Sequence, residues 1–318
     1  MRLLKAILLR LVYGVLSLLF ISLVTFFAGS LSPFNAAQVL AGEKASPEAV
    51  HRKEVELGLD QPWPVQYGRY VMKAAQGDLG QSYFNMNRPV KQILAEPIRL
   101  TMTVAVAAIL LASIIGLLLG TIAAIYRSRA PDTAVLTVST LGVTIPNFVL
   151  LPLLVYLFAN VMGQLPGTWI EFTRHDLPLY YGIALPVIVL AARPMALLTR
   201  LTRASMIDTL QQEFIKTAIA KGVPPARLIL KHALRNAILP VIAAIGVNFG
   251  YLLTGSFVVE TAYNMPGLGQ KAITAIQQRD IPLIQATVLI TGALFIAINL
   301  IVDILLPLLD PRIREAQV

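Results

Sequence analysis

The side chains with the greatest capacity for chemistry gather in one polar stretch of an otherwise apolar C-terminal half. Residues 200–240 hold two acids, Asp208 and Glu213, against seven cations: Arg200, Arg203, Lys216, Lys221, Arg227, Lys231 and Arg235. In a membrane protein, such an excess of Lys and Arg marks a loop that stays in the cytoplasm. The loop contains no Ser-His-Asp constellation and no His-Glu pair on a helix, so we expect it to dock a partner and not to catalyse a reaction.

Two other groups of residues could suggest a phosphate-binding loop or a metal site, but their spacing or position excludes both. Gly267-Leu268-Gly269-Gln270-Lys271 lacks the spacing of a phosphate-binding loop, and it belongs to a turn that we expect to face outward. The three histidines, His51, His175 and His232, fall in three different loops, and the chain has no cysteine. We therefore predict no catalytic residue, no metal site and no cofactor in this chain.

The composition is that of an integral membrane protein. Of 318 residues, 56% are hydrophobic and only 14% charged, and the mean hydropathy is +0.71. A net charge of +9 would suggest nucleic acid as a partner of a soluble protein, but here much of the excess lies in loops predicted to face the cytoplasm. Nucleic-acid binding is therefore not expected.

The elements that must position the loop are membrane spans. We predict an all-α protein of six transmembrane helices with both termini in the cytoplasm, because each short inner loop is basic. The first run is too long for a signal peptide, so we expect it to be retained. The six spans are 11–33, 100–126, 133–162, 177–199, 236–259 and 281–302.

The third and fifth spans carry residues that are candidates for lining a translocation path. Pro146 and Asn147 interrupt the third span, which predicts a kink that either lines a pathway or is purely structural. Asn248, Tyr251 and Ser256 lie in the fifth span, where polar residues either line a cavity or join helices. The sequence leaves both alternatives open.

Arg193-Pro194 interrupts the fourth span near its inner end. We expect the Arg193 side chain to extend to the membrane interface, and an ion pair with Asp303 on the last span is the alternative hypothesis.

The segment 33–99, between the first two spans, is predicted to lie outside the membrane. Ser46-Pro47-Glu48 is a typical helix start, with an N-cap, a first-turn proline and an acid near the helix dipole, and Gly58 is the expected end of that helix. We favour a folded subdomain over a solvated linker, because structureless loops of this length are uncommon.

Within the basic loop, residues 209–221 predict one short helix. Gly222 stands where a left-handed C-terminal cap belongs, and a second helix is expected to begin at Pro224 or Pro225. A helix this short is marginal alone in water, so we expect a partner surface to hold it.

Three stretches of the loop resemble a known family: Thr202-Arg203-Ala204-Ser205-Met206, Thr217-Ala218-Ile219-Ala220-Lys221-Gly222, and 232–240, which ends in Ile238-Leu239-Pro240. They are similar to the EAA loop of permease subunits of bacterial ABC importers, in the oligopeptide, dipeptide and nickel group. Lys216 replaces the glutamate of the general motif, and the distance from Gly222 to the final proline is longer than in sugar-type permeases. The peptide group shares both departures.

The resemblance implies a type I importer permease without catalytic activity, in the inner membrane of a bacterium. The short helix would couple to a cytoplasmic ATPase subunit through Glu213, Phe214, Lys216, Thr217, Ala218, Lys221 and Gly222. Two such ATPases would bind ATP and Mg²⁺, and a homologous second permease would complete the path. An external substrate-binding protein would dock on the outer loop after the fifth span, with Tyr263, Asn264, Pro266, Gly267 and Gly269 as candidates.

The implied cargo is a peptide, with nickel chelates, glutathione and peptide antibiotics as alternatives within the same family. A secondary transporter or an intramembrane enzyme is a distant alternative, because the spans are almost free of ionisable residues away from their inner ends. The expected organisation is a tail and first span (1–32), an outer subdomain (33–99), a permease core (100–310) and a cytoplasmic tail (311–318).

Overall fold

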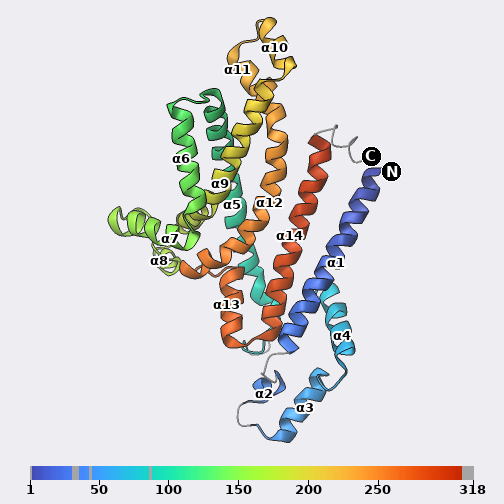
Figure 1. Ribbon diagram of the computed structural model, residues 1–318. Helices are drawn as coiled ribbons and strands as arrows, with labels where there is room; N and C mark the ends of the chain where they lie inside the picture. Colours follow the sequence, from blue (N-terminus) through green and yellow to red (C-terminus); the bar gives the residue numbers. More distant parts are fainter. Residues whose placement is uncertain (1, 31–35, 43–44, 86–87, 310–318) are drawn as a thin grey trace. The chain divides into compact units, whose positions relative to one another are not determined.

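The computed structural model describes residues 2–30, 36–42, 45–85 and 88–309, and its regular structure is helical (Figure 1). One isolated bridge, between Gln81 and Pro89, is the only β pairing in this part of the chain. The end of the first predicted span and the tail at 311–318 lie outside the described residues. The all-helical class predicted from the sequence is confirmed.

Five described helices are long and apolar enough to cross a membrane. They lie in α1 (Arg2–Ser30), α5 (Val90–Ile125), α9 (Leu179–Leu210), the run Pro225–Ala262, and α14 (Ile281–Leu309). A sixth crossing results if α6 (Ala130–Thr144) and α7 (Asn147–Val155) together form one broken span. The chain is thus a helical membrane protein with five or six apolar spans.

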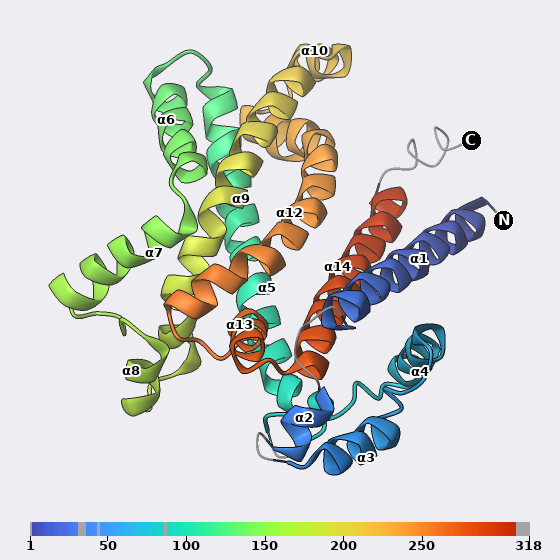
Figure 2. The ribbon, with the colours of Figure 1, turned by 60° about the horizontal axis from the view of Figure 1, so that its bottom comes forward.

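The third predicted span is bent far more sharply than a kink. α6 and α7 meet at an angle of 105°, and Figure 2 shows α7 turned away from the axis of α6. The break falls at Ile145 and Pro146, whose extended backbone ends α6, whereas Pro152 lies inside α7 without breaking it. A single kinked helix over 133–162 is therefore wrong, although the apolar run does end near Met162, after the π-helical turn η1 (Tyr156–Val161).

Contacts between α-carbons divide the chain into two compact units. The first comprises Met1–Thr101 and Pro266–Ile296, and so contains α2 (Ala36–Ala41), α3 (Pro47–Leu57), α4 (Trp63–Ala75) and α13 (Leu268–Gln278). The helix predicted after Ser46 is confirmed: the Ala49 amide donates to the Ser46 hydroxyl, and Gly58 ends the helix with a φ of 70°. The segment 33–99 therefore holds regular helices.

Aromatic contacts hold α4 against α1 in this unit. The Tyr67 hydroxyl donates to the Leu19 carbonyl at 3.0 Å and lies 2.8 Å from the Ser22 hydroxyl. The Tyr67 ring meets the Phe26 ring edge-on, and Trp63 lies against Phe27. These pairs attach α4 to α1 while much of α4 stays exposed.

A buried carboxylate anchors the loop before α5 to the start of α14. Asp280 is fully buried and accepts hydrogen bonds from the Ser82 hydroxyl, from the Tyr83 amide at 3.2 Å and from the Leu283 amide at 3.4 Å. The last of these makes Asp280 an N-terminal cap of α14, where a carboxylate also favours the helix dipole. Burial raises the pKa of the neighbouring Tyr83 phenol, and the charge of Asp280 adds to that effect.

The second unit comprises Met102–Met265 and Ala297–Val318, and α9 lies at its centre, packed against α6 and α12 (Leu234–Ala262). Small residues allow close approach. A Cβ added at Gly120 on α5 would lie 2.5 Å from the Thr199 carbonyl oxygen, and one at Gly142 on α6 would lie 3.1 Å from the Ala192 carbonyl oxygen. α5 and α6 therefore both rest on the backbone of α9.

Arg193 does not interrupt α9, which runs unbroken through Pro194. The Arg193 side chain is exposed, and no ion pair joins it to Asp303 within the described chain. The hypothesis of an Arg193–Asp303 pair is not supported.

Candidate functional site

The short helix of the basic loop is α10 (Glu213–Ala220), and it lies beyond the ends of α9 and α12 (Figure 1). α9 continues to Leu210, and the extended backbone of Gln212 then starts α10. The single helix predicted over 209–221 is therefore wrong, because Thr209 and Leu210 belong to α9 and the break at Gln211 and Gln212 precedes α10. Neither glycine nor proline marks this break, so the sequence offered no local signal for it.

The C-terminal end of α10 is as predicted. Gly222 has a φ of 75° and its amide donates to the Ile219 carbonyl, while the Val223 amide donates to the Ala218 carbonyl. Only glycine adopts this left-handed conformation at little cost. The second helix begins at Pro225, also as predicted, and passes through α11 (Pro225–Arg227) and a π-helical stretch, η2 (Leu228–Ala233), into α12.

One face of α10 is buried within the chain itself. Ile215 is 1% exposed and Ala218 is 9% exposed. Ile215 belongs to a cluster whose other buried members come from α5, α9, η2 and α12: Ala124, Met206, Ala233 and Ala237. Burying an isoleucine side chain contributes about 2 kcal/mol, so the cluster holds this short helix on the spans beneath it. Ile215 was not among the residues predicted to matter, although it lies three residues before Ala218 on the same helical face.

The other positions of α10 form its exposed side. Phe214 and Ile219 flank the buried face on its two sides and are 44% and 58% exposed, and Leu230 on the following element is 64% exposed. Glu213, Lys216, Thr217, Lys221 and Gly222 are also exposed. Lys216 donates to Glu213 at 2.7 Å, a surface pair that adds little stability. Of the predicted coupling residues, only Ala218 faces inward, and the role of the others stays a prediction.

The candidates for the translocation path separate into two groups. Asn248 and Ser256 are buried, and each donates to a carbonyl of its own helix, those of Ala244 and Leu253 respectively. This geometry favours a role in helix packing. Tyr251, in contrast, is 69% exposed on α12.

The other two path candidates lie at the break between α6 and α7. Pro146 is exposed and Asn147 is partly buried. A Cβ added at Gly255 would lie 3.7 Å from the Asn147 side-chain nitrogen, so the break approaches α12 at a glycine. Their role in lining a path stays a prediction.

The loop after α12 is largely buried. Tyr263 is fully buried, its hydroxyl donates to the Pro166 carbonyl at 2.8 Å, and its own carbonyl accepts from the Trp169 amide at 2.9 Å. Burial raises the pKa of Tyr263, so its hydroxyl remains a donor throughout the physiological range. Gly267 and Gly269 are buried as well, and Asn264 is the exposed candidate, at a left-handed φ of 55°. Docking of a binding protein on this loop stays a prediction.

No group of three or more His, Asp or Glu side chains in the described residues could hold a metal ion.

Comparison with known proteins identifies the family. Residues 116–315 match the model of the binding-protein-dependent transport system inner membrane component, and residues 3–107 match the model of the N-terminal part of such membrane components. The chain belongs to this family of inner membrane transport components. It is accordingly a multi-pass protein of the bacterial inner membrane and a permease component of an ABC transport system.

Full-length relatives agree with this assignment. The permease is 38% identical over 309 residues to a putative peptide transport system permease protein of Brucella abortus (strain 2308), which covers 97% of this chain and 98% of the relative. It is 37% identical over 302 residues to the glutathione transport system permease protein GsiC of Escherichia coli (strain K12), which covers 95% of this chain and 96% of that relative. The predicted resemblance to peptide-type permeases is confirmed.

Proposed function

We propose that this permease is the membrane-spanning subunit of an ATP-driven importer of peptides. The observation that carries the proposal is α10, a short helix that the chain's own core fixes on one face and that leaves Phe214 and Ile219 exposed on the two sides of that face. Exposed apolar side chains beside cations suit a protein partner. The proposed partner is a cytoplasmic ATPase subunit that seats α10, one of two that bind ATP and Mg²⁺ themselves.

The proposed assembly contains a homologous second permease and an external binding protein that delivers the cargo. We propose six spans, with α6 and α7 forming one broken span, and both termini in the cytoplasm. The basic loop 200–240 is then cytoplasmic, as its seven cations favour. The chain itself carries out no reaction.

In this mechanism, ATP moves the spans through α10. Closure of the ATPase pair on ATP displaces the seated helix, and the displacement changes the balance between inward-facing and outward-facing arrangements of the spans. ATP drives this change only because it binds the two arrangements with different affinities.

Peptides are the first candidate cargo, because the Brucella relatives are named as peptide permeases. Glutathione is the second candidate, on the strength of the similarity to GsiC. Nickel chelates and peptide antibiotics remain alternatives within the family, and a secondary transporter or intramembrane enzyme is a distant one.

The test uses the permease purified with its partner subunits in lipid vesicles. With the binding protein present, di- to oligopeptides are expected to raise ATP hydrolysis and to enter the vesicles. Stimulation by glutathione alone would move the assignment to the second candidate, and stimulation by a nickel chelate alone would exclude both. Uptake driven by a proton gradient without any ATPase would overturn the proposal.

A further inference from the structure

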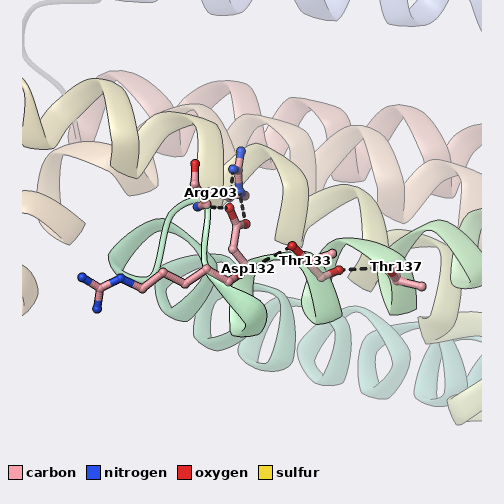
Figure 3. A network of polar contacts seen from close by, with 6 residues as sticks. Asp132, Thr133, Thr137 and Arg203 are labelled. Carbon is pink, nitrogen blue, oxygen red and sulfur yellow. Dashed lines mark hydrogen bonds and ion pairs between the residues drawn. The ribbon is translucent and has the colours of Figure 1, made fainter.

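A partly buried ion pair joins the start of α6 to α9, close to the end of α9 that leads into α10 (Figure 3). Arg203 Nε donates to one carboxylate oxygen of Asp132 at 2.6 Å, and Arg203 Nη2 donates to the other at 2.7 Å. The Ser128 amide donates to the second oxygen at 2.8 Å. The Asp132 side chain is only 4% exposed and that of Arg203 is 23% exposed.

We propose that the Asp132–Arg203 pair locks α6 to α9, so that a displacement of α10 is carried to the helix break at Pro146. Both residues would act as positioning residues, since neither touches cargo or nucleotide in this scheme. The inference rests on the proposed function and adds to it the route by which α10 reaches the broken span.

The geometry of the pair suits a lock. Two parallel hydrogen bonds from a planar guanidinium to a carboxylate fix both distance and orientation, which a single contact does not. A buried ion pair is often no better for stability than an apolar pair of the same size, so fixed geometry is the property that such a pair supplies most specifically.

Close packing reinforces the pair along α9. Farther from α10, a Cβ added at Gly142 of α6 would lie 3.4 Å from the Ala196 Cβ, in addition to its close approach to the Ala192 carbonyl. α6 therefore contacts α9 at two levels, one ionic and one through small side chains. Two separate attachments prevent α6 from pivoting on α9.

The other end of the route runs from α9 to α10. Only Gln211 and Gln212 separate the two helices, and Met206 near the end of α9 is buried in the same cluster as Ile215 of α10. Arg203 lies on α9, three residues before Met206. A push on α10 is thus transmitted through buried contacts to α9, and through the ion pair to α6.

The C-terminal end of α6 leads directly into the break between α6 and α7. Thr133, Thr137, Thr140 and Thr144 are exposed on one face of α6, and each hydroxyl donates to a carbonyl four residues earlier. Figure 3 shows the first two of these threonines beside the ion pair. The helix that the pair holds ends at Thr144, directly before the break at Ile145 and Pro146.

The test measures peptide uptake and ATP hydrolysis together, in vesicles that contain the complete importer. Asp132→Asn keeps the shape of the side chain but removes its charge, and Arg203→Lys keeps the charge but removes the paired hydrogen bonds. We expect Asp132→Asn to lower uptake per ATP hydrolysed by about tenfold, within the usual range of coupling between sites, and Arg203→Lys to lower it less. Glu56→Gln, which breaks the exposed 2.7 Å pair with Lys53, is the matched control and should leave the ratio unchanged.

An unchanged ratio in Asp132→Asn would overturn the inference, even if the amount of assembled importer falls. Wild-type importer that takes up no peptide would instead contradict the proposed function, so the two failures are distinguishable.

A covalent link gives a second test that holds even if Asp132→Asn does not assemble. The chain has no cysteine, so Gly142→Cys with Ala196→Cys forms the only pair, at a Cβ separation close to that of a disulfide. If α6 and α9 move together, the oxidised protein keeps its uptake. A loss of uptake that a reductant restores would show that the two helices move apart, and would overturn the lock.

Discussion

At the scale of single residues, the turn that ends α10 depends on the left-handed backbone conformation of Gly222. Gly222 has a φ of 75°, and a Cβ there would meet no atom within 4 Å. Glycine is therefore favoured at this position by the left-handed backbone conformation and not by a lack of room for a side chain. A β-branched residue would add strain of about 1–2 kcal/mol. The strain would fall on the turn that sets the end of the docked helix.

We predict that Gly222→Val reduces uptake several-fold while the amount of permease in the membrane stays the same, because the strain distorts α10 without touching the spans. Transport assays and immunoblots of membranes provide the measurement. Gly77→Val is the matched control, since Gly77 has a φ of 79° and equally open surroundings far along the chain from α10. Equal losses in both variants, or none in Gly222→Val, would contradict the assignment of Gly222 to coupling.

Asp280 is the second residue whose substitution has a predicted effect, in this case on the stability of the permease. Its carboxylate serves the Ser82 hydroxyl and backbone amides on both sides, and Asp280→Asn would replace one acceptor oxygen by a donor facing other donors. We expect the free energy of unfolding to fall by about 2 kcal/mol, the typical cost of leaving buried groups unsatisfied. Thermal unfolding of the detergent-solubilised permease measures this.

The control for Asp280 is Asp60→Asn, which changes an exposed carboxylate in the same unit. A melting temperature of Asp280→Asn that matches this control would show that the buried hydrogen bonds contribute nothing.

At the scale of elements, the sequence predicted those helix ends that a local signal marks. Ser46 and Gly58 bound α3, Gly222 ends the turn after α10, and Pro225 starts the next helix, each for reasons of capping or backbone conformation. These positions are readable because the cause lies within a few residues.

The features that the sequence did not predict have causes far along the chain. The break at Gln211 and Gln212 carries no glycine or proline, and the angle of 105° at Pro146 depends on what α7 packs against. Asp132 and Arg203 stand 71 positions apart, so no spacing rule could pair them. Ile215 became significant only once the fold placed it beside Met206.

At the scale of the whole molecule, family membership follows from matches that cover nearly the entire chain. The candidate site itself was located from the sequence by its charge imbalance, its glycine and its resemblance to other permeases. The division of α10 into a buried face and an exposed side was not predicted, because a helix of this length has too few positions to separate the two. The proposed function therefore depends on what the exposed side of α10 contacts.

The most direct test is to cross-link the exposed side of α10. Because the chain lacks cysteine, Ile219→Cys at the edge of that side and Met72→Cys on α4 each introduce a single thiol at a well-exposed position, 58% and 67% exposed in the wild-type side chains. In membranes that contain the complete importer, a thiol-to-amine cross-linker is expected to join Ile219→Cys to an ATPase subunit and to leave Met72→Cys unjoined to it. An Ile219→Cys protein that reacts with the linker but captures no ATPase subunit would contradict the account.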